Sequence, residues 1–187
     1  MKKKEYGVLK NILLITLSAI ISLLLVMAFF MSQFTCQKKS LLDYTSEKNE
    51  DPFYNYLDQC EFEENNGHYL VIRGWAVDLE SFYAGFNYGT DSNIFGYEDN
   101  AGFALVNGKD VYVLKTRTFV KKGVNEVMAQ VLGQNNVTDY KNSGIESVVN
   151  LDFGGIEDPS GYEIGIIYSR RNEKPILVMT EESVPEK

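Results

Sequence analysis

The chain has 187 residues, with 18 Lys and Arg against 26 Asp and Glu, and carries a formal net charge of −8 at pH 7. This length leaves room for one domain with a proper core beyond a short terminal segment. The charges before residue 40 are Lys2, Lys3, Lys4, Lys10, Lys38, Lys39 and Glu5. Residues 40–187 therefore retain 12 of the 18 cations and 25 of the 26 acids, a net charge of −13. Such a field repels phosphates, so nucleic acid is excluded as a partner.

Residues 12–31 form an uncharged apolar run, ILLITLSAIISLLLVMAFFM. At about 1.5 Å rise per residue, a helix over this run spans the hydrocarbon core of a bilayer, which is about 30 Å thick. Because no water can satisfy peptide groups there, the run is predicted to be helical. Four lysines precede it and two follow closely. The positive-inside bias predicts a cytoplasmic tail at residues 1–11 and an extracytoplasmic C-terminal part at the cell membrane.

A cleaved signal peptide is the competing interpretation of this N-terminal segment, because it also begins with basic residues and an apolar run. Against cleavage, the run exceeds the usual apolar core of about 7–15 residues, and no A-x-A pattern follows it. Lipoprotein processing at Cys36 is disfavoured because Thr35 and Gln33 occupy positions that require a small and an aliphatic residue. We therefore expect 12–31 to be an uncleaved transmembrane signal anchor.

Residues 32–51 are mostly polar and predict a stalk, and residues 52–187 are expected to form the extracytoplasmic domain. The domain opens with an aromatic segment, Pro52–Phe62, expected to pack on a sheet edge, with Pro52 able to open a helical turn. The two cysteines, Cys36 and Cys60, do not form a disulfide framework, and whether they pair is left open.

The segment His68–Asp78 (HYLVIRGWAVD) has apolar residues on both faces of an extended chain, which predicts a central strand. Gly74 inside it indicates a close backbone approach. Trp75 is expected to plug the core, with exposed sugar stacking as the alternative.

Residues 79–102 are rich in Gly, Asn, Asp and aromatic residues and predict a long loop, a kind of segment that is often functional. With Trp75, the loop's aromatic residues are the candidate binding residues for a glycan or protein. These residues are Phe82, Tyr83, Phe86, Tyr88 and Tyr97.

Further strands are predicted along the rest of the chain. Asn107-Gly108 between β-rich arms predicts a hairpin over 103–115. Strands are expected at 116–120, 144–153, 162–169 and 175–180, and either a strand or a helical turn at 124–132. About seven short strands separated by turn signals predict an all-β protein, an antiparallel immunoglobulin-like β-sandwich preceded by one transmembrane helix.

Three features together resemble a known pattern: Ile72-Arg73-Gly74-Trp75-Ala76, the later hairpin, and a penultimate strand over 161–168 with a closing strand ending at Thr180. They are similar to immunoglobulin-like domains with a "GWA" strand on bacterial cell-envelope proteins, often membrane-anchored and sometimes joined to glycan-assembly enzymes. Those domains commonly carry an Arg-Asp-Val run, whereas the corresponding region here is Thr116-Arg117-Thr118-Phe119-Val120 and lacks the acid. The resemblance implies an accessory or binding role instead of catalysis.

No nucleophile motif, phosphate-binding glycine loop or EF-hand spacing is present, and the single histidine, His68, excludes multi-histidine zinc sites. We expect no enzyme activity, cofactor or metal, although oxygen ligands for a cation exist at 91–93 and 97–100. The predicted function is a membrane-tethered binding or scaffold module for a cell-surface glycan or envelope protein. The alternative is an accessory hydrolase of envelope polysaccharide using paired acids such as Asp91 and Glu98.

Overall fold

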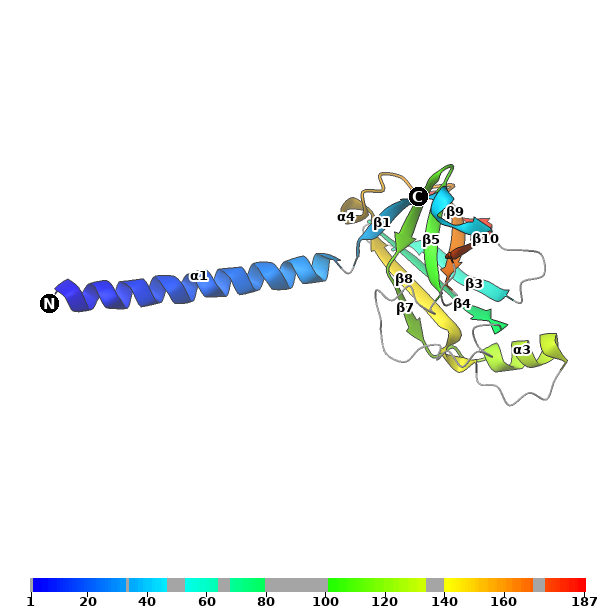
Figure 1. The fold of residues 1–187 in the computed structure, drawn as a ribbon, viewed down its shortest axis with the longest axis horizontal. Coiled ribbons are helices and arrows are strands. Elements are labelled where there is room, and N and C mark those ends of the chain that lie inside the picture. Colours follow the sequence, from blue (N-terminus) through cyan, green and yellow to red (C-terminus); the bar gives the residue numbers. More distant parts are fainter. Residues whose placement is uncertain are drawn as a thin grey trace. The chain divides into compact units, whose positions relative to one another are not determined.

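The structure is a computed structural model, which describes residues 2–32, 34–46, 53–63, 68–79, 101–133, 140–169 and 174–187. It divides into two compact units, Met1–Phe34 and Thr35–Lys187. The elements are shown in Figure 1. The helices are α1 (Lys2–Ser32), η1 (Leu41–Asp43), α3 (Val124–Leu132), η2 (Lys141–Ser143) and α4 (Leu151–Gly154). The strands are β1 (Cys36–Ser40), β2 (Thr45–Ser46), β3 (Phe53–Phe62), β4 (Tyr69–Asp78), β5 (Gly102–Asn107), β6 (Asp110–Leu114), β7 (Thr116–Phe119), β8 (Gly144–Asn150), β9 (Glu163–Tyr168) and β10 (Ile176–Ser183).

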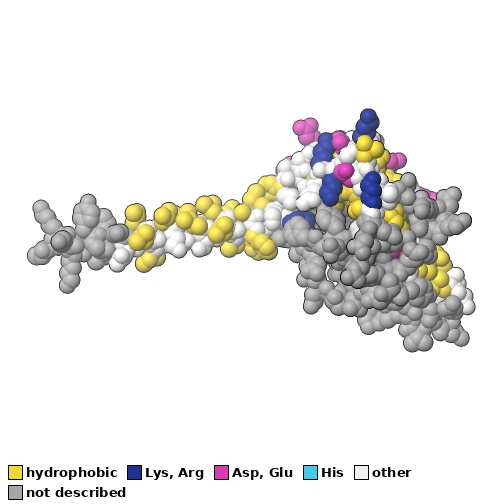
Figure 2. Space-filling model, in the orientation of Figure 1, with side chains coloured by type: hydrophobic (Ala, Val, Ile, Leu, Met, Phe, Trp, Pro, Cys, Tyr) yellow, Lys and Arg dark blue, Asp and Glu magenta, His cyan; other side chains and the backbone are white. Residues whose placement is uncertain are grey.

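The first unit is the helix α1, whose segment Asn11–Ser32 is long and apolar enough to cross a membrane. Its side chains from Asn11 to Met31 are exposed, and the described part that faces the viewer in Figure 2 is apolar or uncharged. The predicted helix over 12–31 is therefore present, and within the described residues its apolar side chains are exposed.

The second unit consists of two mostly antiparallel sheets. One has six strands in the order β1-β6-β5-β9-β10-β2, in which only the β10–β2 pair is parallel. The other has four antiparallel strands in the order β3-β4-β8-β7. The main core draws side chains from both sheets, including the fully buried Phe103, Ile164 and Ile166 of one and Leu70 and Ile72 of the other. The core therefore lies between the sheets, as in a sandwich.

Strand β4 lies between β3 and β8, which confirms the predicted central strand. Its inward residues Leu70 and Ile72 join the main core, whereas Trp75 and Val77 on the opposite face join a second cluster with α3. The close approach predicted at Gly74 is also present, because a Cβ there would overlap the carbonyl oxygen of Tyr56 on β3.

The hairpin predicted over 103–115 is formed by β5 and β6. Its loop is shifted by one residue from the expected dipeptide, because Asn107 pairs with Asp110 and leaves Gly108 and Lys109 as the turn. Gly108 has a φ of +59°, a conformation that glycine adopts without steric cost. The glycine therefore sets this turn from its first position.

The stalk predicted at 32–51 is wrong for its middle part. Residues 36–40 form β1, and every residue of β1 pairs with β6. The short strand β2 pairs with β10. Ser40 caps η1 between these strands, accepting a hydrogen bond from Leu42 N–H. β1 is an edge strand, where lysines are common because their charge blocks pairing with other chains, and Lys38 pairs with Asp110 at 2.6 Å. Because this edge strand is polar, its sequence looks like that of a flexible linker.

The structure refines the prediction for three other segments. The aromatic segment at 52–62 is itself the edge strand β3, with no helical turn among its described residues. The ambiguous segment at 124–132 is the helix α3. The strand expected over 144–153 ends at Asn150, whose side chain accepts a hydrogen bond of 3.1 Å from Phe153 N–H and begins α4.

Candidate functional site

A hollow with a volume of about 650 Å³ lies on the four-stranded sheet. It is on the outer face, because Arg73 alternates along β4 with the core residues Leu70 and Ile72 and lines the hollow. The second cluster, with Trp75 and α3, occupies another part of this face. The lining residues are Asp58, Gln59, Arg73, Arg117, Thr118, Phe119, Lys121 and Glu146.

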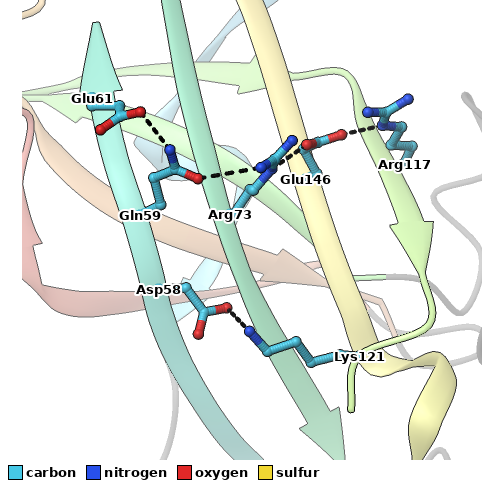
Figure 3. A network of polar contacts seen from close by, with 7 residues as sticks. All are labelled: Asp58, Gln59, Glu61, Arg73, Arg117, Lys121 and Glu146. Carbon is cyan, nitrogen blue, oxygen red and sulfur yellow. Dashed lines mark hydrogen bonds and ion pairs between the residues drawn. The ribbon is translucent and has the colours of Figure 1, made fainter.

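Glu146 on β8 is the central residue of the hollow. One carboxylate oxygen, Oε1, accepts a hydrogen bond from Arg73 Nε, and the other, Oε2, accepts one from Arg117 Nε. Arg73 comes from β4 and Arg117 from β7, the two strands beside β8, so the three charges form a row across the sheet (Figure 3). The Glu146 side chain is 4% exposed, against 46% for Arg73 and 66% for Arg117.

The environment of Glu146 keeps its carboxylate ionised. Burial opposes the charge, but the hydrogen bonds and positive charges of Arg117 and Arg73 outweigh it and hold the pKa below its ordinary value of 4.5. With both oxygens engaged and the charge fixed, Glu146 orients the two guanidinium groups.

Strand β3 extends the polar row on the other side of Arg73. Arg73 Nη1 donates to Gln59 Oε1 at 3.4 Å, and Gln59 Nε2 donates to Glu61 Oε1 (Figure 3). The register of β3 against β4 shifts between Leu57 and Gln59, which places Asp58 in a bulge. Because of the bulge, two consecutive residues line the hollow, and Asp58 Oδ2 accepts a hydrogen bond of 2.7 Å from Lys121.

A glycine shapes the wall of the hollow on the β7 side. A Cβ on Gly144 of β8 would lie 2.7 Å from the carbonyl oxygen of Phe119 and 3.0 Å from both its ring and the Lys121 side chain. The missing side chain therefore lets Phe119 and Lys121 pack against β8. The hollow thus combines an aromatic wall with three cationic and two anionic side chains.

Comparison with protein-family models, curated proteins and solved structures gives no match for this chain.

Of the predicted binding residues, only Trp75 lies in the described part of the chain. It is 8% exposed and packs with Val77, Val124 and Met128 beneath α3. Trp75 therefore belongs to a core cluster and does not offer a surface for stacking, which corrects its predicted binding role. The cluster also lies outside the core between the sheets, where the tryptophan was expected. The others, Phe82, Tyr83, Phe86, Tyr88 and Tyr97, lie outside the described residues, as do both candidate cation segments.

The two cysteines are free thiols. Cys36 Sγ donates to the carbonyl oxygen of Gly154 at 3.1 Å, and burial raises the pKa of this thiol. Burial, together with the charges of Glu182 and Glu61, raises the pKa of Cys60 to about 12. Both thiols stay protonated at neutral pH and are poor nucleophiles and metal ligands. Within the described residues, no cluster of three His, Cys, Asp or Glu could hold a metal ion.

The sequence prediction missed the Arg73–Glu146–Arg117 row. Glu146 is the direct cross-strand partner of both arginines, 73 residues from one and 29 from the other. The local signal was Arg73, a charged residue in the middle of the otherwise apolar strand His68–Asp78. The partner of Arg73 depends on the register between strands. That register is set by tertiary pairing.

Proposed function

We propose that the chain is a single-pass, membrane-tethered binding or scaffold module whose β-domain stands outside the cytoplasm and binds its partner in the hollow around Glu146. The anchor is supported by α1, because an apolar helix whose side chains are exposed from Asn11 to Met31 needs lipid to cover it. The orientation is supported by the lysines that precede the span. The immunoglobulin-like relationship carried by the "GWA" strand is part of the same proposal.

The observation that carries the binding role is the organisation of the hollow. Arg73 and Arg117 are held in place by one buried carboxylate, yet about half or more of each side chain is exposed. Fixing side chains before a ligand arrives lowers the entropy that binding must overcome. The two arginines are therefore already oriented for contact with a ligand that enters the hollow.

The hollow offers no support for the hydrolase alternative. A glycosidase requires one carboxyl group that can donate a proton to the leaving group. It also requires a second carboxylate that is free to attack the sugar or to activate water. Glu146 is ionised with both oxygens engaged, and Asp58 is paired with Lys121. Asp91 and Glu98, the acids of that alternative, lie outside the described residues.

Photo-crosslinking in the organism that encodes the chain tests the proposed binding site. The full chain would carry benzoylphenylalanine in place of Phe119, which lines the hollow, and in a matched variant in place of Phe153, which is 46% exposed on α4. We expect irradiation of intact cells to attach envelope material at position 119 at least fivefold more efficiently than at 153. Equal yields at the two positions would refute the hollow as the binding site.

A further inference from the structure

The terminal nitrogens of the two arginines, Nη1 and Nη2, are the hydrogen-bond donors of the hollow that Glu146 does not engage. Each arginine holds Glu146 through Nε, which leaves the Nη groups at the far end of the planar side chain. Among the described residues, the one hydrogen bond to these groups joins Arg73 Nη1 to Gln59. Arg117 is 66% exposed and lines the hollow, so its two Nη groups can reach a ligand.

The charge balance of the hollow is opposite in sign to that of the domain. Its lining includes Arg73, Arg117 and Lys121 against Asp58 and Glu146, a net charge of +1. The Debye length at physiological salt is about 8 Å, so the acidic surface farther away is largely screened. A small anionic group in the hollow therefore interacts mainly with this local positive charge.

The geometry of the guanidinium group selects the kind of anion. Its planar N–H groups match the paired oxygens of a carboxylate or a phosphodiester, and both ligands accept two hydrogen bonds at once. The ring of Phe119 and the hydroxyl of Thr118 also line the hollow and would contact the carbon chain or sugar beside the charge. A duplex nucleic acid, which requires many Lys and Arg contacts along its backbone, does not match this small site.

A polymer fits the site better than a free ion. Ion pairs with exposed side chains are worth about 0–1 kcal/mol each, so one anionic group at this hollow binds weakly. Repeated groups on one polymer, presented to many tethered copies in one membrane, raise the effective concentration and compensate for weak single contacts. This step depends on the proposed tethering.

We propose that the hollow between β3, β4, β8 and β7 binds the anionic repeat units, carboxylate or phosphodiester, of a polymer outside the membrane, with Arg117 and Arg73 as the ligand-contacting residues. The proposal rests on the proposed binding function and specifies its ligand class.

The test measures binding of phosphatidylcholine liposomes that carry many copies of the full chain to immobilised polymers of matched length. Polygalacturonate supplies carboxylates, poly(glycerol phosphate) supplies phosphodiesters, and dextran is the neutral polymer. Arg117→Gln removes one guanidinium group, and Lys122→Gln is the matched control, an exposed residue nearby that does not line the hollow. We expect binding to at least one anionic polymer, at least a tenfold loss for Arg117→Gln and less than a twofold loss for Lys122→Gln.

The two anionic polymers identify the source of the charge. Binding to only one of them identifies carboxylate or phosphodiester as the ligand group. Binding to both shows that the site accepts either anion. Arg117→Lys keeps the charge but loses the planar fork, so we expect it to lose at least threefold even if the glutamine variant does not fold. Equal binding to dextran, equal losses in Arg117→Gln and Lys122→Gln, or no binding to either anionic polymer would overturn the proposal. If crosslinking at position 119 still succeeds, only the ligand class is refuted and the binding function stands.

Discussion

Replacing Gly74 with alanine is expected to lower the free energy of unfolding by about 3 kcal/mol or more. The new Cβ would overlap the carbonyl oxygen of Tyr56, and it would also lie 3.3 Å from the Leu57 Cα. Both obstacles are backbone atoms beside the β3 bulge, so no side-chain rotation relieves the clash and the strands must separate. Chemical unfolding of the full chain, followed by the fluorescence of its single tryptophan, Trp75, measures the change.

Gly108→Ala is the matched control for this prediction. A Cβ at Gly108 meets nothing within 4 Å, but its φ of +59° is unfavourable for alanine. We expect a loss of about 1 kcal/mol from backbone strain alone. If Gly74→Ala costs no more than Gly108→Ala, the close approach of β3 and β4 at this position is wrong.

Replacing Glu146 with alanine is expected to lower the free energy of unfolding by about 2 kcal/mol at pH 7. Removing one member of a buried ion pair costs about 3–5 kcal/mol when the other charge stays buried. Here the arginines that remain are 46% and 66% exposed, so water solvates them in part and the cost is smaller. The matched control is Glu157→Ala, an exposed acid for which we expect a change within about 0.5 kcal/mol.

The contribution of Glu146 should also depend on pH. Its pKa in the folded chain lies below the ordinary value of 4.5, so its full stabilisation is present above that value. As the pH falls below 4.5, the unfolded chain takes up the proton first, and the stabilisation is lost as the pH passes through the lower folded pKa. The stability difference between the native chain and Glu146→Gln should therefore shrink as the pH falls from 5 toward 2. A difference that stays constant over this range would contradict the ion-pair row.

Predictions from sequence succeeded where the signal is local. The apolar helix over 12–31 follows from one uncharged run, and the two faces of the strand around Trp75 follow from alternation. The hairpin followed from Gly108, although its turn begins at the glycine instead of at Asn107. Each of these depends on neighbouring residues alone.

Predictions failed where the outcome depends on residues that are distant in the chain. Cys36–Ser40 becomes a strand because β6 offers a pairing edge, which the local sequence does not show. Trp75 is buried, as expected, but it packs against α3, about 50 residues later, and not between the sheets. Glu146 acquires its role only when β4 and β7 pair on either side of it. The row that organises the hollow is a product of strand register.

We propose that α1 anchors a β-domain outside the cytoplasm, and the glycosylation state of the chain is the most direct test of this anchor and its orientation. The full chain would be translated with rough microsomes, where its own Asn136-Val137-Thr138 is an acceptor for N-glycosylation in the lumen. We expect a full-length, membrane-integrated product that is glycosylated and protected from added protease, and we expect Asn136→Gln to abolish the glycosylation. A full-length product that is unglycosylated and digested by the protease would contradict the orientation, and a shortened product released into the lumen would contradict the anchor.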